Sequence, residues 1–289
     1  MQRRLTPNPS ALPQRVAQRI DAGDHAGALT LCDAGLRAAP DDPVLLTNRG
    51  LALLGLGDAA AARRSFNRAI NEDPTIASAW NGLGQAFYDL GDPAKAAGAF
   101  QSAANLTPDP AQARYHRGMA LLAMGDFAAG WSEYEHRIAM PSMKLRRYDA
   151  PRWTGAPLAG RRLLVTAEQG YGDMMQFARF LPRAAACGGP VIFEAPAELL
   201  PILAPLARGV TLRAMEDGPV PADAFDCHAH LMSLPGLFGI TADSIPDGIP
   251  YLAAPPDRVA AWRKALPDDG RKTGLCWAGR PSHPQDSQR

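Results

Sequence analysis

A short glycine-containing loop, EQGYGDMMQF at residues 168–177, carries the residues whose types could do chemistry. Asp173 would stand at the start of the helix that follows, where the helix dipole favours the charged form of a carboxylate. A charged carboxylate in a loop can accept a proton or bind a ligand hydroxyl. The residue also suits a structural role, because aspartate caps helices and Gly170 and Gly172 supply a tight turn. Both interpretations stay open.

Two histidines, His228 and His230, form a second candidate group. They alternate with Cys227 and Ala229, so on an extended segment both imidazoles project to one face. The pair could bind a metal, line a cleft and hydrogen-bond a ligand, or be structural. Asp226 is the one third metal ligand nearby, and nothing has the spacing of a zinc finger. We therefore expect no metal site.

The loop is a weak match to a dinucleotide-binding fingerprint. The sequence GYGDMM lacks the third glycine of that motif. Asp173 would also stand where a pyrophosphate meets the helix N-terminus, and like charges repel. NAD binding is therefore disfavoured, and we expect no cofactor.

The elements that must position these residues alternate between strand and helix patterns. Short apolar runs predict strands at 161–166, 190–194 and 210–215, and helical periodicity predicts helices at 174–187 and 197–207. This order favours a right-handed, doubly wound parallel sheet. Ligands of such sheets bind at the carboxyl ends of the strands, which is where the loop would lie.

The N-terminal half is different, because it repeats every 34 residues. The repeat carries glycine at 50, 84 and 118, and it also carries the sets Asp58, Asp92, Asp126 and Phe66, Phe100, Tyr134. Each unit predicts two amphipathic helices joined by a glycine-containing turn. A degenerate copy, with Ala28, Cys32 and Pro40, precedes these units, as suits a terminal repeat with one neighbour.

Residues 9–142 resemble the tetratricopeptide repeat. The third unit has every signature position filled: Trp80, Leu83, Gly84, Phe87, Ala96, Phe100, Ala103 and Pro108. The resemblance implies a solenoid with a concave groove for a protein or peptide partner, and the candidate groove residues are Asn48, Asn81, Gln85 and Arg117. A spacer or dimerisation role without a peptide ligand is the alternative. A carboxylate-clamp adaptor is disfavoured, because the phased Lys and Arg residues of such a clamp are missing.

Four later segments, in order, resemble the heptosyltransferases of glycosyltransferase family 9. They are EQGYGDMMQFARFLP (168–182), FDCHAHLMSLPGLFG (225–239), IPYL (249–252) and GLCWAGRPSHPQD (274–286). Bacterial proteins that join tetratricopeptide repeats to such a domain are the specific likeness. The resemblance implies the acceptor-side, Rossmann-like half of a GT-B fold and a nucleotide-diphosphate sugar as donor, without an obligatory metal.

The same resemblance assigns roles to residues. Asp173 would be the general base that deprotonates an acceptor hydroxyl, and the expected substrate-binding residues are Glu168, Gln169, Gly170, Gly172, Gln176, His228, His230 and Trp277. In the family, the strand at 273–278 opens a second Rossmann-like domain that holds most of the donor. Only a truncated start of that domain fits into residues 273–289.

The expected organisation is therefore a repeat solenoid at 1–144, a linker at 145–160, a Rossmann-like half at 161–272 and the truncated start at 273–289. The expected function is a repeat scaffold joined to an incomplete glycosyltransferase-like domain that modifies a glycan or protein acceptor. The alternative is a non-catalytic interaction module with a remnant α/β domain.

Composition limits the other classes. A formal net charge of +1 gives no overall field for nucleic acid or an anionic membrane. No segment approaches the roughly 18 uninterrupted apolar residues of a membrane span, and the N-terminus lacks the apolar core of a signal peptide. The four scattered cysteines encode neither a disulfide framework nor a zinc ribbon, so we expect a cytoplasmic protein.

Overall fold

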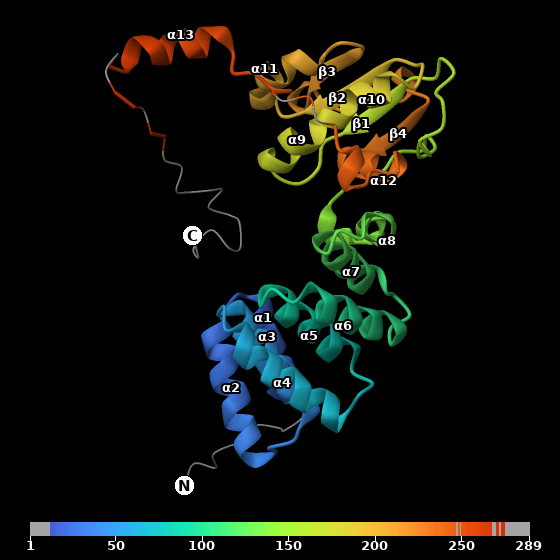
Figure 1. Cartoon of the computed structure of the whole chain (residues 1–289). Coiled ribbons are helices and arrows are strands. Elements are labelled where there is room, and N and C mark those ends of the chain that lie inside the picture. Colours follow the sequence, from blue (N-terminus) through green and yellow to red (C-terminus); the bar gives the residue numbers. More distant parts are fainter. Residues whose placement is uncertain (1–11, 247, 249, 268–269, 272, 275–289) are drawn as a thin grey trace.

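The chain forms a helical repeat array followed by an α/β domain (Figure 1). The structure is a computed structural model that describes residues 12–246, 248, 250–267, 270–271 and 273–274. The repeat array consists of four helix pairs: α1 (Leu12–Asp21) with α2 (His25–Ala38), α3 (Pro43–Gly55) with α4 (Ala59–Glu72), α5 (Ala77–Asp89) with α6 (Pro93–Asn105), and α7 (Ala111–Ala123) with α8 (Phe127–Tyr134). The predicted fold class, a repeat solenoid followed by a parallel-sheet domain, is confirmed.

Repeated glycine and aspartate residues make the same turn in every pair. The glycines before the second helices, Gly23, Gly57, Gly91 and Gly125, have φ between 75° and 82°, a conformation that favours glycine. The aspartate that follows each one caps the second helix by accepting a backbone N–H three residues on. The degenerate first copy uses this turn as well.

Small residues let the two helices of a repeat approach closely. A Cβ atom at Gly50 would lie 2.5 Å from the ring of Phe66, and one at Gly84 would lie 2.6 Å from the ring of Phe100. Both phenylalanine rings are buried and fill this space. Gly118 is closer still to its partner helix, because a Cβ there would lie 2.5 Å from the backbone nitrogen of Tyr134.

The α/β domain is built on a parallel four-stranded sheet. Its strands are β1 (Leu163–Thr166), β2 (Val191–Ala195), β3 (Val210–Ala214) and β4 (Cys227–His230), arranged in the order β3-β2-β1-β4. The chain moves outward from β1 to β3 and then crosses to the other side of β1. The carboxyl ends of β1 and β4 therefore flank the position where the strand order reverses, which is where open α/β sheets bind ligands.

The predicted helix at 174–187 is divided in the structure. It consists of α9 (Tyr171–Phe177), a 3₁₀ turn η4 (Ala178–Phe180) and α10 (Leu181–Ala185), and Pro182 is the second residue of the last piece. The predicted helix at 197–207 is divided into η5 (Ala197–Leu199), α11 (Leu200–Leu203) and η6 (Ala204–Leu206). Proline lacks the N–H that continues an α-helix, which accounts for a division at each proline.

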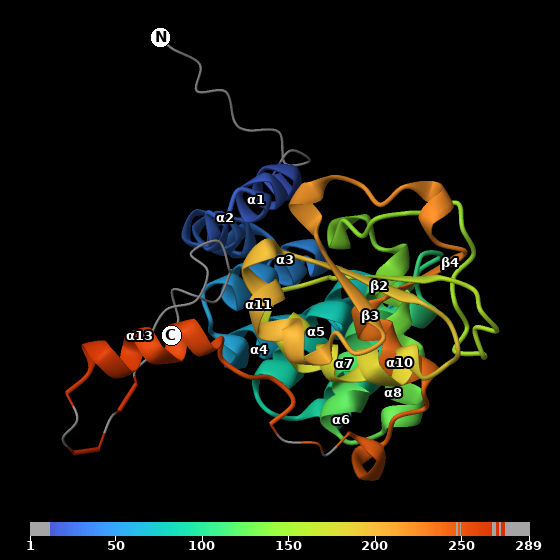
Figure 2. The same cartoon turned by 90° about the horizontal axis from the view of Figure 1, so that it is seen from above.

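Several elements were not among the strands and helices predicted. These are β4 and two further helices, α12 (Leu234–Leu237) and α13 (Pro256–Ala265), together with the remaining 3₁₀ segments, η2 (Glu135–Ala139), η3 (Pro141–Met143), η7 (Met215–Asp217), η8 (Ala222–Ala224), η9 (Leu231–Ser233) and η10 (Ala242–Ser244). Helix α13 buries no residue and projects away from the rest of the molecule, as Figures 1 and 2 show.

The two faces of the sheet are covered differently. Leu163 and Val165 of β1 pack in a large cluster with residues of α9, α10 and α11. Leu164 points to the other face, where its cluster contains Val220, Phe225 and Tyr148. Within the described residues that second cluster draws on non-helical segments and on the 3₁₀ turn η8, so the second helical layer of the expected doubly wound sheet is not seen there.

The predicted linker wraps around the edge of the sheet. Arg152 forms a parallel bridge with His228, and the N–H of Trp153 donates to the carbonyl of His228 at 2.7 Å. Trp153 itself is buried against Phe238. The segment thus extends the sheet beyond β4 while it connects the two parts of the chain.

Helix α8 of the last repeat packs on α12 of the α/β domain. In a stack of repeats each second helix contacts the first helix of the next repeat. Here α12 takes that place, and Gly236 permits the approach, since a Cβ there would lie 3.1 Å from Cβ of Trp131. The repeat array therefore ends on the α/β domain rather than on a polar capping helix.

Candidate functional site

The glycine-containing loop leaves the carboxyl end of β1, as predicted. Gln169, Gly170, Gly172 and Gln176 are exposed, and Asp173 is half-buried in the first turn of α9. Oδ2 of Asp173 accepts the backbone N–H of Gly170 at 3.1 Å. Asp173 therefore closes the first turn from the third helical position. The catalytic role of this carboxylate remains a prediction, because a cap can also be a base.

Glu168 is buried and bound by a residue of the repeat array. Its carboxylate accepts Nε of Arg137 at 3.0 Å and Nη2 of the same side chain at 2.7 Å. The backbone N–H of Met232, after β4, donates to Glu168 Oε1 at 2.9 Å. These bonds occupy the carboxylate that was predicted to bind substrate, so the structure gives Glu168 an internal role and leaves its substrate contact untested.

Arg137, on η2, is fully buried and its five N–H donors all have acceptors. Two bind Glu168, and the others bind Glu135 Oε1 at 2.6 Å, Ser233 Oγ at 2.9 Å and the carbonyl of Tyr134 at 3.4 Å. Burial alone would lower the pKa of Arg137, but Glu168 and Glu135 raise it above its usual value. The guanidinium is therefore charged and joins three segments of the chain.

Two tyrosine rings of the last repeat lie beside this ion pair. The guanidinium lies 4.6 Å from the ring centroid of Tyr134, and the ring of Tyr115 lies 5.3 Å from that of Tyr134. Burial raises the pKa of both tyrosines. The charges of Glu168 and Asp173 raise them further, which places the end of the repeat array within electrostatic reach of the loop.

A cavity of about 210 Å³ opens at the carboxyl ends of β1 and β2. Its wall consists of residues from the loop, the strand ends and the linker: Met143, Lys144, Leu145, Arg146, Thr166, Ala167, Glu168, Gln169, Met174, Glu194 and Met215. Glu194 is buried and pairs with Arg146 at 2.6 Å and Arg213 at 3.4 Å. Lys144 and the half-exposed Arg146 bring positive charge to this edge of the sheet.

The two histidines lie side by side on β4, as expected for alternate residues of a strand. Their ring centroids are 6.1 Å apart, and both side chains are buried. Nδ1 of His230 and Oγ1 of Thr166 are 2.9 Å apart, whereas Nδ1 of His228 has no hydrogen-bond partner among the described residues. Burial lowers both pKa values, that of His230 to about 4, so both imidazoles are neutral at pH 7.

The structure does not bring a metal-binding group around these histidines. Within the described part of the chain no three His, Cys, Asp or Glu residues come together to hold an ion. Asp226, the third ligand considered from the sequence, binds Arg162 instead, at 2.8 Å.

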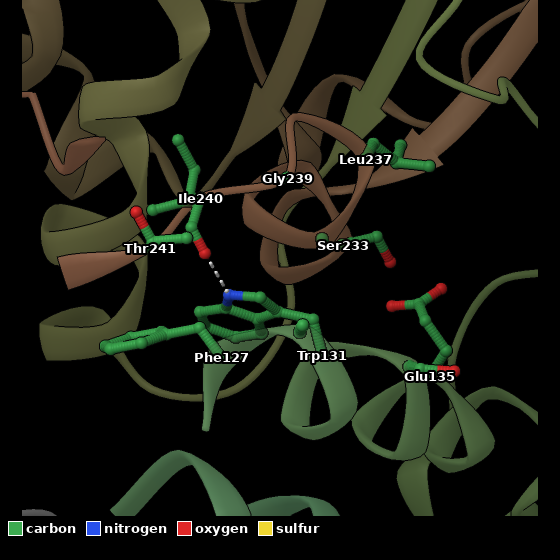
Figure 3. A pocket seen from close by; sticks show the side chains of 11 residues that line it. Phe127, Trp131, Glu135, Ser233, Leu237, Gly239, Ile240 and Thr241 are labelled. Carbon is green, nitrogen blue, oxygen red and sulfur yellow. Dashed lines mark hydrogen bonds between the residues drawn. The ribbon is translucent and has the colours of Figure 1, made fainter. Parts of the chain in front are cut away.

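A larger cavity, of about 400 Å³, lies between the last repeat and the α/β domain (Figure 3). Phe127 and Trp131 of α8 form one side, and Leu237 and Ile240 line the other. The indole N–H of Trp131 donates to the carbonyl of Ile240 at 3.1 Å. The Glu135 carboxylate faces Ser233 at the polar end, and its pKa is lowered by Arg137 against the effect of burial.

The predicted groove residues all lie on first helices of the repeats. Asn81 Oδ1 is 3.3 Å from Nδ1 of His116, Gln85 donates to Asp89 at 2.7 Å, and Arg117 pairs with Glu133 at 3.2 Å. Asn48 is half-buried on α3. Their role in binding a partner stays a prediction.

The predicted strand at 273–278 lies at the C-terminal end of the residues that the structure describes. Trp277 lies outside the described residues, as does most of the strand. The same holds for the proposed start of a second domain at 273–289, of which two residues are described.

The tetratricopeptide-repeat family model matches residues 47–110 and 86–135. Residues 47–135 are tetratricopeptide repeats. The crystal structure of MamA protein has 25% identity and covers 46% of this chain and 73% of its own, with a TM-score of 0.41. A mutant O-GlcNAc transferase of Thermobaculum terrenum has 20% identity and covers 66% of this chain and 38% of its own, with a TM-score of 0.43.

A curated relative extends past the repeats. Protein FlbA of Caulobacter vibrioides is 30% identical over 274 residues, which is 88% of this chain and 41% of FlbA. Because the match covers 88% of the chain, it includes part of the α/β domain as well as the array. The chain spans about two fifths of the length of this relative.

Sequence reasoning missed three residues that shape the site: Arg137, Arg146 and Glu194. Arg137 follows the last periodic helix, and Arg146 lies in the linker, so neither belongs to a repeating pattern. Glu194 ends the predicted second strand and is a charged residue in an otherwise apolar run. A charged residue in a buried strand usually has a partner of opposite charge, and this is the signal by which Glu194 could have been found.

The neutral state of His230 makes stability depend on pH. A histidine whose pKa falls from 6.5 to about 4 on folding binds more protons when unfolded, so its contribution is present above pH 6.5 and is lost as the pH falls toward 4. We expect His230→Asn to reduce the loss of unfolding free energy between pH 7 and pH 5 by about 2 kcal/mol relative to the unsubstituted chain.

Urea unfolding at the two pH values, followed by circular dichroism, measures this difference. The buried His116, whose pKa is also about 4, is unchanged in both proteins and cancels. Equal pH dependence in the variant and the parent would contradict a neutral, buried His230.

Proposed function

We propose that the chain joins a protein-binding repeat array to a sugar-transfer domain, in which the carboxyl edge of the sheet binds part of a nucleotide-diphosphate sugar. The observation that carries the proposal is the composition of this edge. Glu168, Gln169 and Met174 of the loop that bears Asp173 form one part of the cavity wall, although Asp173 itself does not line it. Lys144 and Arg146 form another part, with Arg146 paired to Glu194. Transfer to a hydroxyl needs a carboxylate near the acceptor and positive charge near the leaving diphosphate.

The size of the cavity limits what it can hold. Pockets for whole drug-sized ligands measure about 300–1,000 Å³, and this cavity measures about 210 Å³. It would therefore take a diphosphate or one sugar ring, and a second domain of the kind found in the resembled family would complete the site. The match covers 41% of FlbA, so the unmatched part of that protein is long enough to contain such a domain.

Position supports a link between the two parts of the proposal. Glu168, at the start of the loop, is bound by Arg137 of the segment that ends the repeats. A protein or peptide bound by the tetratricopeptide repeats would thus be held in a fixed position relative to the loop that bears Asp173. We propose that the repeats select the acceptor, or the protein that carries it.

The binding part of the proposal is tested with Arg146→Ala. A charge-assisted hydrogen bond contributes about 1.5–3 kcal/mol, so we expect the variant to bind a nucleotide-diphosphate sugar about tenfold or more weakly. Calorimetry of the 289-residue chain with UDP-glucose, GDP-mannose and ADP-glucose measures this. Arg147→Ala is the matched control, because the neighbouring arginine does not line the cavity.

Two outcomes count against the binding proposal. One is no detectable binding of any of the three sugars at millimolar concentration, which favours the alternative, a non-catalytic interaction module. The other is an equal loss of affinity in the Arg146 and Arg147 variants, which would show that the sugar nucleotide does not bind in this cavity.

The catalytic part is tested with Asp173→Asn. Asparagine can still accept the Gly170 N–H but loses the attraction of the charge to the helix dipole, so we expect a loss of stability of no more than about 1 kcal/mol and unchanged nucleotide-sugar affinity. General-base catalysis contributes about 10²–10⁴-fold, so release of sugar from the donor, followed by chromatography of the nucleotide product, should fall by that factor. If the Asp173→Asn variant releases sugar as fast as the parent, Asp173 is not a general base and serves only to cap the helix.

A further inference from the structure

The strongest unexplained feature is a charged side chain of the repeat array that is buried in the α/β domain. Arg137 has no exposed surface, and neither does the side chain of Glu168. Removing both groups from water is costly, so a pair of this kind persists where its geometry satisfies every donor. All five N–H donors of Arg137 are used, which only arginine can do.

The acceptors lie in three segments that are far apart in sequence. Tyr134 and Glu135 belong to the end of the repeats, Glu168 follows β1, and Ser233 follows β4. Since β1 and β4 flank the reversal in strand order, Arg137 connects the two loops at the ligand-binding position of the sheet.

The loop next to Glu168 is held in an unfavourable conformation. Gln169 has a φ of 66°, which lies in the left-handed region that residues other than Gly, Asn and Asp seldom adopt. Such a backbone persists when its surroundings fix it on both sides. Here one fixed point is Glu168, bound by Arg137, and the other is the Gly170–Asp173 turn.

We infer that Arg137 is a positioning residue, through which the repeat array holds the Asp173 loop in place. The loop keeps its conformation only while the last repeat is docked on the α/β domain. Arg137 would order the loop in this way whether or not the chain transfers sugar. Only its consequence for turnover rests on the proposed function.

The test is hydrogen exchange of the full chain, followed by mass spectrometry. Two variants are compared with the parent: Arg137→Met, and Arg137→Lys, which keeps the charge but cannot bridge the three segments. In both we expect the backbone amides of residues 167–176 to exchange at least about ten times faster than in the parent. Over the time in which the loop amides exchange, peptides that cover β2 and β3 should stay protected, because their amides exchange only by global unfolding.

Arg114→Met is the matched control. Arg114 makes the same two-bond contact with a glutamate, Glu133, at 3.0 and 2.9 Å, but within the repeats. We expect this variant to leave the 167–176 amides unchanged. In Arg137→Gly, added ethylguanidinium should restore slow exchange to the loop, which a general loss of packing would not allow.

Three results overturn the inference. They are an unchanged loop in both Arg137 variants, equal acceleration of the loop and the strands, and acceleration by Arg114→Met as large as by Arg137→Met. If Arg137→Met does not fold, Glu168→Gln replaces it, because the amide still accepts the Met232 N–H. Loop-specific acceleration is again expected, and its absence refutes the positioning role. A chain that binds no nucleotide sugar but shows the loop effect refutes the proposed function alone.

Discussion

The ion pair between Arg137 and Glu168 is the interaction on which the arrangement of the two parts depends. It is buried on both sides, and removing one partner from such a pair costs about 3–5 kcal/mol because the other charge is left without compensation. That penalty ties the conformation of the loop after β1 to the presence of the repeats. The junction is thus specified by charge as well as by shape.

The apolar packing at the junction follows from how repeats stack. A tetratricopeptide repeat exposes an apolar face on its second helix unless another element covers it. Helix α12 and the turn at Ile240 cover part of that face, and Trp131 contacts both Phe177 and the Ile240 carbonyl. The cover is incomplete, which leaves the cavity of about 400 Å³ shown in Figure 3.

Local rules predicted the repeats well, because each repeat depends on contacts near in sequence. The glycine and aspartate of each turn, and the pairing of Gly84 with Phe100, repeat every 34 residues and can be found from one sequence. The strands β1, β2 and β3 were also predicted from short apolar runs, whereas β4, which contains two histidines, was not. The prediction of two continuous helices was wrong, because the prolines at 182, 201 and 205 lie close to the points where the helices are divided.

The site could be predicted only in part. The position of Asp173 after the first strand follows from the strand and turn patterns. The burial of Glu168 does not, because its partner lies 31 residues earlier in a segment without periodicity. Ion pairs between residues far apart in sequence depend on how the repeat array packs on the α/β domain. Local sequence patterns do not predict this packing.

Whether the two parts form one cooperative unit is tested most directly by urea unfolding followed with fluorotryptophan NMR. Trp80 reports on the repeats, and Trp153 reports on the core of the α/β domain. If the buried ion pair joins the parts, the native signals of both residues will disappear in the same transition. Loss of the Trp153 signal at a clearly lower urea concentration, with Trp80 still native, would contradict the account.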